Sequence, residues 1–137
     1  MMNLFSKPPT NLGVKAGRLS DCPGSPNCVC TQAAAETHQM APIPFKGSVD
    51  EVHERMMSAI GSMPRARITE AMPTYIRAEF TTAILRFVDD VEVLIDAEAR
   101  VIHYRSASRI GHSDLGTNRK RMEELTKRFL ASAPDAG

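Results

Sequence analysis

Two alternating runs of sequence decide the fold of this chain: residues 84–96, ILRFVDDVEVLID, and residues 101–109, VIHYRSASR. In both runs most apolar side chains recur at every second position, which is the period of a β-strand with one buried face. The connection between them, Ala97-Glu98-Ala99, is too short for a crossover helix, so the two runs must pair as antiparallel neighbours. The sequence therefore predicts an antiparallel sheet that contains this hairpin.

The alternation also assigns the side chains of the hairpin to two faces of the sheet. We expect one face of the first run, apolar except for Asp89, to pack against helices; it comprises Leu85, Phe87, Asp89, Val91, Val93 and Ile95. A turn of two or four residues places Ser106 and Ser108 beside Asp89 on that face. The outer face is charged and comprises Arg86, Asp90, Glu92, His103, Arg105 and Arg109. We expect an N-terminal arm to cover these charged side chains.

A helix is predicted before the strand region, over residues 48–63. Its apolar side chains recur at helical spacing, and Ser48 and Glu51 have the spacing of a capping box. Pro64 follows the last turn and ends the helix. The strand region follows at residues 65–109. Within it, residues 75–80 alternate in the same way as the hairpin.

The final helix is predicted over residues 114–131, with Ser113 or Asp114 as its cap and basic side chains toward its end. The order helix, strands, helix predicts an α+β fold: an antiparallel sheet of about four strands with two helices packed on one face, and an extended N-terminal arm. The expected divisions are a flexible N-terminus at 1–15, a single α+β domain at 16–132 (arm 16–47, helix 48–63, strands 65–109, helix 114–131) and a tail at 133–137.

Composition and charge exclude several classes of protein. The chain has 137 residues, enough for one domain with a real core, and 42% of them are hydrophobic. Its net charge of +1 and its aromatic content of 5%, without any tryptophan, argue against nucleic acid as a partner. Neither a secretory signal nor an apolar stretch of membrane-spanning length is apparent in the sequence, so we expect a soluble protein of the cytoplasm.

The junction between the last strand and the last helix, residues 105–121, is the strongest candidate for a binding site. Its sequence, RSASRIGHSDLGTNRKR, holds four arginines, one lysine and several small polar residues. Guanidinium groups and the free N–H groups of a helix N-terminus together favour an anion such as a phosphate or a carboxylate. The candidate ligand-binding residues are Arg105, Ser106, Ser108, Arg109, Asp114, Asn118 and Arg119.

A structural interpretation competes with the anion site, because three carboxylates precede the junction. Cross-strand ion pairs between the two arginines of the strand and Asp90 or Glu92 would use the same guanidinium groups, and such pairs contribute about 0.2–1 kcal/mol each. Asp89, Asp90 and Glu92 also raise the question of a metal site or of acid–base catalysis. We expect a structural polar network, with neither a metal nor a cofactor, because adjacent residues of a strand point to opposite faces.

Three cysteines lie in a segment rich in Pro and Gly, CPGSPNCVC at residues 22–30. Their spacing matches no zinc motif. A disulfide between Cys22 and Cys28 would close a small loop but fits an oxidising compartment, whereas a reactive thiol would need a nearby base such as His38. Simple packing of small cysteine side chains is the third interpretation, and the sequence leaves all three open.

Three segments together resemble the family known as domain of unknown function 1499. They are the arm with Leu12-Gly13, Leu19 and CPGSPNC at 22–28, the strand RFVDDVE at 86–92, and the junction with RSASR at 105–109, Gly111, Asp114, Gly116, Asn118 and 119–121. The resemblance runs from about residue 12 to residue 130 and implies no assigned activity. It implies that Cys22 and Cys28 match a cysteine pair of the family, while Cys30 stands where a serine is expected. Many relatives are membrane-anchored or exported.

The leading hypothesis is an uncharacterised small, non-enzymatic binding or accessory protein. Its partner would be a small anionic ligand or another protein, and its site would be the 105–119 junction facing the arm. One alternative is a thiol-dependent enzyme or redox protein that uses Cys22 or Cys28. Another alternative is a protein-interaction module that binds through its N-terminal arm.

Overall fold

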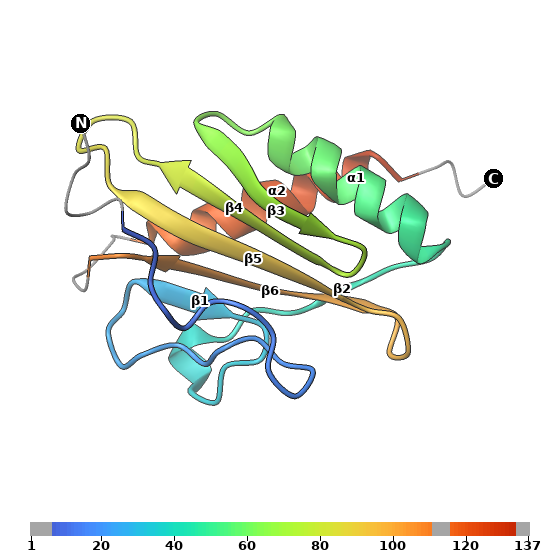
Figure 1. Cartoon of the computed structure of the whole chain (residues 1–137), viewed down its shortest axis with the longest axis horizontal. Helices are drawn as coiled ribbons and strands as arrows, with labels where there is room; N and C mark the ends of the chain where they lie inside the picture. Colours follow the sequence, from blue (N-terminus) through green and yellow to red (C-terminus); the bar gives the residue numbers. More distant parts are fainter. Residues whose placement is uncertain (1–6, 111–115, 134–137) are drawn as a thin grey trace.

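The computed structural model describes residues 7–110 and 116–133 of the chain. Figure 1 shows one antiparallel sheet with α-helices behind it and the N-terminal arm in front. The elements in chain order are β1 (Cys28–Cys30), the 3-10 helix η2 (Glu36–His38), β2 (Ile43–Pro44), α1 (Val49–Gly61), β3 (Ala66–Met72), β4 (Tyr75–Thr81), β5 (Val88–Asp96), β6 (Val101–Ser108) and α2 (Thr117–Ala131). The fold class is α+β, as predicted.

The sheet has six strands, so the predicted number of about four is wrong. The strand order is β1-β6-β5-β4-β3, and β2 pairs with β6 as well. Both β1 and β2 come from the arm, and both pair antiparallel to β6. Strands of three and two residues are too short to show an alternating pattern, which is why the sequence did not predict them. Their pairing satisfies backbone groups that β6 would otherwise expose along an edge.

The hairpin of β5 and β6 has the predicted register. Its turn comprises the four residues 97–100, so Asp89 pairs with Ser108 and Val91 with Ser106 on the inner face. On the outer face Glu92 pairs with Arg105. The predicted division of the hairpin into two faces is therefore confirmed within β5 and β6.

The predicted first strand of this hairpin starts too early, because residues 82–87 form the loop between β4 and β5. The N–H of Phe87 donates to Thr82 Oγ1 at 2.8 Å, and the N–H of Thr82 donates to the carbonyl of Phe87 at 2.8 Å. Arg86 has a φ of +59°, which is incompatible with an extended strand. As a result Leu85, expected to face the helices, is 68% exposed, and Ile84 beside it is 89% exposed.

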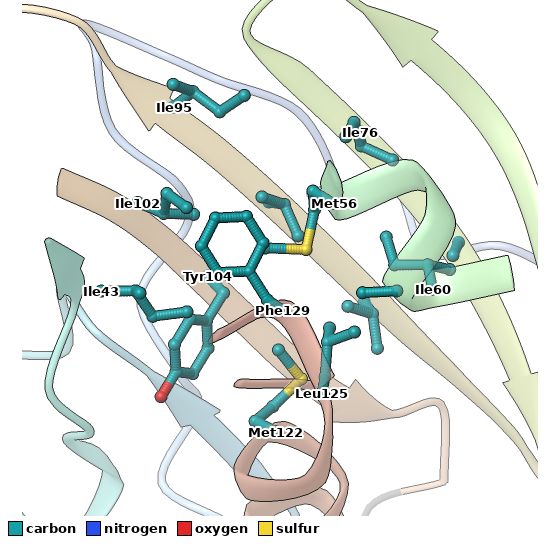
Figure 2. Close-up of a cluster of buried hydrophobic side chains, with 14 of the residues drawn as sticks. Ile43, Met56, Ile60, Ile76, Ile95, Ile102, Tyr104, Met122, Leu125 and Phe129 are labelled. Atoms are coloured by element: carbon teal, nitrogen blue, oxygen red, sulfur yellow. The ribbon is translucent and has the colours of Figure 1, made fainter. Parts of the chain in front are cut away.

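The hydrophobic core lies between the inner face of the sheet and the two α-helices. Figure 2 shows its main side chains, which are Ile43, Met56, Ile60, Ile76, Ile95, Ile102, Tyr104, Met122, Leu125 and Phe129. The apolar stripe predicted for residues 48–63 faces this core, and Met122, Leu125 and Phe129 of α2 face it as well. Full burial of an aliphatic or aromatic side chain of this size contributes about 1.5–3 kcal/mol, so the packing of the helices on the sheet dominates the stability of the fold.

The N-terminal arm covers the outer face of the sheet, as predicted. Leu19, Cys30 and Ala33 of the arm pack with Tyr75 of β4 and Leu94 of β5 in a second apolar cluster. In Figure 1 the arm crosses in front of the strands, whereas α2 runs behind them. Asp90, Glu92 and Arg105 of the charged outer face are buried, whereas Arg86 is exposed.

The two α-helices are amphipathic and begin in different ways. Ser48 caps α1, because its Oγ accepts a hydrogen bond from the N–H of Glu51 at 3.1 Å, as predicted. Helix α2 begins at Thr117, directly after Gly116 with its φ of +81°, and the predicted caps Ser113 and Asp114 lie outside the described residues. Neither helix is long and apolar enough to cross a lipid bilayer, as judged over the residues that the structure describes.

Candidate functional site

The predicted site residues divide between the two faces of the sheet, because neighbouring residues of a strand alternate. Arg105 and Arg109 lie on the outer face, beneath the arm, where they contact carboxylates of that face. Ser106 lies on the inner face and contacts Asn118 in the first turn of α2. Ser108 ends β6 and contacts Asn118 as well. The candidate ligand-binding residues, which we predicted to form one site, thus belong to two separate polar groups in the structure.

Arg109 is the centre of a buried ion-pair network on the outer face. Its Nε and Nη2 atoms each lie 2.9 Å from an oxygen of Asp90, and Nη2 lies 2.8 Å from Glu79. The side chains of Arg109 and Asp90 are 4% and 2% exposed. Arg67, which is 74% exposed, donates to the other oxygen of Glu79 at 2.9 Å. Burial alone would raise the pKa of Glu79, but the hydrogen bonds from the two arginines outweigh it and lower that pKa.

Arg105 belongs to a second outer-face group, which is centred on Glu92. Arg105 Nη1 lies 3.8 Å from Glu92 Oε1, and its Nη2 donates to the carbonyl of Asp21 at 3.4 Å. Glu92 is fully buried, and its Oε2 accepts hydrogen bonds from the hydroxyl of Tyr75 at 2.6 Å and from the N–H of Gly13 at 2.7 Å. Burial and the hydrogen bond to Glu92 raise the pKa of Tyr75 well above its ordinary value. The arm therefore closes over a buried carboxylate of the sheet.

The polar group of the inner face ties α2 to the sheet. Arg121 Nη2 lies 2.7 Å from Asp89 Oδ2, and both side chains are buried. The hydroxyl of Ser106 donates to Asn118 Oδ1 at 2.6 Å, and the amide of Asn118 donates to Ser108 Oγ at 3.0 Å. Arg121 Nη1 also donates to Asn118 Oδ1 at 2.9 Å. A buried carboxylate needs such a partner, and this group has the character of a structural network.

A cavity of about 190 Å³ lies between the arm and the outer face at the end of β6. Its walls include Pro23, Ser25 and Asn27 from the arm and Asp90, Arg105 and Arg109 from the sheet. Two of these residues also carry a buried N–H group, at Arg105 Nε and Arg109 Nη1, that has no hydrogen-bond acceptor among the described residues. A buried donor without an acceptor is costly and rare in native proteins. An acceptor provided by a ligand would remove that cost.

The cysteines provide a disulfide and one buried thiol. Cys22 and Cys28 form the disulfide, which closes the loop on the arm side of the cavity. Cys30 is a buried free cysteine, and burial raises the pKa of its thiol, so it is a poor nucleophile at neutral pH. His38 Nδ1 lies 2.8 Å from the carbonyl of Cys28. Across residues 7–110 and 116–133, no group of three or more His, Cys, Asp or Glu side chains is placed to hold a metal ion.

Sequence reasoning missed two polar side chains, Asn27 and Arg121, and three of its candidates, Ser106, Asn118 and Arg119, do not line the cavity. Asn27 is buried: its side chain accepts from Ser25 Oγ at 2.7 Å and donates to the carbonyl of Ile110. Arg121 was predicted only as one of the basic side chains of the last helix, and its spacing of three residues from Asn118 was the one available signal. The predicted Arg119 donates to the carbonyls of Thr37 and Gln39 at 3.2 Å each, and Asp114 lies outside the described residues.

Comparison with known proteins identifies a family without assigning an activity. No curated protein matches the chain. One family model matches residues 18–129, which extend from the arm through the whole sheet to the last turns of α2. That family is described as "Protein of unknown function (DUF1499)", and it is the family that the sequence resembles. Because the match covers most of its length, the chain belongs to this family of proteins of unknown function.

Proposed function

We propose that this protein is a small non-enzymatic binding or accessory domain that takes an anionic group into the cavity between the arm and β6. One observation carries the proposal: Arg105 and Arg109 line the same cavity, and each has a buried N–H without an acceptor among the described residues. A carboxylate or phosphate oxygen placed between them would accept both hydrogen bonds. Hydrogen bonds of this kind, with a charge on each partner, are stronger than neutral ones.

The charges around the cavity favour a ligand group with a single negative charge. The network contains three arginines and three carboxylates, namely Arg67, Arg105, Arg109, Glu79, Asp90 and Glu92. It therefore has no surplus positive charge, and a dianion would be repelled more strongly by the carboxylates than a monoanion. The volume of about 190 Å³ is smaller than the roughly 300 Å³ of the smallest typical drug pockets. A carboxylate on a small molecule or at a chain end fits both constraints.

The two alternative functions have less support from the geometry. A thiol-dependent enzyme would need a reactive cysteine, but Cys22 and Cys28 are joined to each other and Cys30 is buried with a raised pKa. An interaction module would need a free arm, but the arm packs against its own sheet through Leu19 and Ala33. The disulfide also favours an oxidising compartment over the cytoplasm that the sequence led us to expect.

The proposal is tested by titrating the oxidised protein with sodium acetate and with inorganic phosphate at constant ionic strength, using sodium chloride as the reference salt. Nitrogen–proton NMR signals of the arginine Nε groups report whether Arg105 meets an acceptor. Arg105→Gln should weaken acetate binding by about tenfold or more, whereas Arg67→Gln, which alters an exposed arginine of the same network, should leave it unchanged. Equal affinities in the two variants, or no saturable shift beyond that in chloride, would refute the proposal.

A further inference from the structure

The loop that forms the arm side of the cavity is closed by the disulfide between Cys22 and Cys28. Pro23, Ser25 and Asn27 all lie inside this ring, and all three line the cavity. The arm side of the anion site is thus built on a covalent bond that a reductant can break. This inference rests on the proposed function, because it concerns control of the same cavity.

The two ends of the loop are attached to the sheet with unequal strength. Cys28 is buried in β1 and pairs with Ala107 of β6, and the carbonyl of Asn27 accepts hydrogen bonds from the Ser108 N–H at 3.0 Å and the Asn118 amide at 3.1 Å. At the other end, the Cys22 N–H donates to Asp21. Residues 23–26, as far as the structure describes their contacts, form a hydrogen bond only within the loop, from Ser25 to Asn27. Arg105 Nη2 of β6 also donates to the carbonyl of Asp21 at 3.4 Å, so the disulfide is the main tie to β1 for residues 23–26 only.

The two cysteines of the disulfide also differ in exposure. Cys22 is partly exposed, whereas Cys28 is 1% exposed. A thiolate of a reductant can therefore approach Cys22 Sγ more easily than Cys28 Sγ. Cys30 packs close to Cys22 in the arm cluster, but a buried thiol with a raised pKa attacks a neighbouring disulfide slowly. Reduction by an external dithiol is then the favoured route, and internal exchange is not.

We propose that reduction of the Cys22–Cys28 disulfide by a dithiol releases the loop from the sheet and lowers the affinity of the cavity for its anion. The reductant thiolate attacks Cys22 Sγ, the sulfur–sulfur bond breaks, and Cys28 leaves as a thiolate that takes up a proton. The second thiol of the reductant then attacks the mixed disulfide and releases Cys22. The two electrons come from the dithiol, which ends as a disulfide, while the protein ends with two thiols. The fold of the sheet and helices stays intact.

The experiment compares oxidised protein with protein reduced by dithiothreitol, using acetate affinity and amide hydrogen exchange as independent measurements. We expect acetate to bind about tenfold more weakly after reduction, because one or two hydrogen bonds from the loop are lost. Exchange should accelerate at the N–H groups of Cys22 and Ala34, which donate to the Asp21 carboxylate, and stay slow in β4 and β5. A Cys22→Ser/Cys28→Ser variant should match the reduced protein, and Cys30→Ser, the matched control, should respond as wild type does.

The possible results distinguish failure of the redox control from failure of the proposed function. Equal acetate affinity and equal exchange in the two redox states would overturn the redox control. Loss of protection throughout β4 and β5 would overturn it as well, because reduction would then unfold the protein instead of releasing one loop. If the oxidised protein binds no acetate, the proposed function fails and the control of binding fails with it. In that case, exchange at Cys22 and Ala34 still shows whether the disulfide holds this end of the loop.

Discussion

Replacing Arg109 by methionine should destabilise this protein much more than replacing Arg67, although both arginines contact Glu79. Arg109 forms two hydrogen bonds to Asp90 and one to Glu79 while almost fully buried, and Asp90 is 2% exposed. Without Arg109 the carboxylate of Asp90 would remain buried without its cation. Breaking a buried ion pair at one side costs about 3–5 kcal/mol. Arg67 is 74% exposed, and an exposed pair contributes about 0–1 kcal/mol.

The assay is urea unfolding followed by far-ultraviolet circular dichroism at pH 7, with the disulfide oxidised. For a slope near 2 kcal/mol per molar urea, Arg109→Met should lower the midpoint by about 2 M and Arg67→Met by less than about 0.5 M. Adding Asp90→Asn to Arg109→Met should restore part of the loss, because the uncompensated charge is removed. A loss below about 1 kcal/mol for Arg109→Met, or equal losses for the two arginine variants, would refute the buried network as described.

Two further predictions concern a carboxylate and a helix cap. The folded-state pKa of Glu79 lies below its ordinary value, since hydrogen bonds from Arg67 and Arg109 outweigh the effect of burial. Its stabilisation is therefore complete above the ordinary pKa of a glutamate and is lost as the pH falls through the lower folded value. The stability of Glu79→Gln, measured by urea unfolding between pH 3 and pH 7, should thus depend less on pH than that of wild type; parallel curves would contradict this. Ser48→Ala removes the hydrogen bond from the N–H of Glu51 and should lower the free energy of unfolding by about 1 kcal/mol. An unchanged urea midpoint would show that the cap does not contribute to stability.

Elements with a long regular pattern were predictable from the sequence because their periodicity is local. β5 and β6 span nine and eight residues, and their short turn fixes both the pairing and the face of each side chain. The same holds for the helices, whose apolar stripes face the core. In contrast, β1 and β2 form because a free edge of β6 is available to them, and that edge exists only after the sheet has assembled. No local pattern carries this information.

The candidate site was predictable in composition but not in arrangement. Strand parity correctly placed Arg105 and Glu92 on one face and Ser106 on the other. It could not show that Arg121, more than thirty residues later in the chain than Asp89, would supply the partner of that carboxylate. Likewise, Tyr75 and Gly13 reach Glu92 from separate elements, so only the folded structure brings them together. Long-range polar partners are specified by packing, which a single sequence read in short windows does not reveal.

The density of donors at the junction now has a structural explanation that narrows the functional proposal. Its four arginines reach four separate places: the Glu92 carboxylate, the Asp90 carboxylate, the carbonyls next to η2 and the Asp89 carboxylate. One corner of the fold must join β5, the arm, η2 and α2, and each joint uses a guanidinium group. Donor density alone therefore says little about a ligand. Two N–H groups are left without an acceptor among the described residues, at Arg105 Nε and Arg109 Nη1, and both arginines line one cavity. The proposed ligand is expected to contact one or both of these N–H groups, so an anion that binds elsewhere on the junction would not support the proposal.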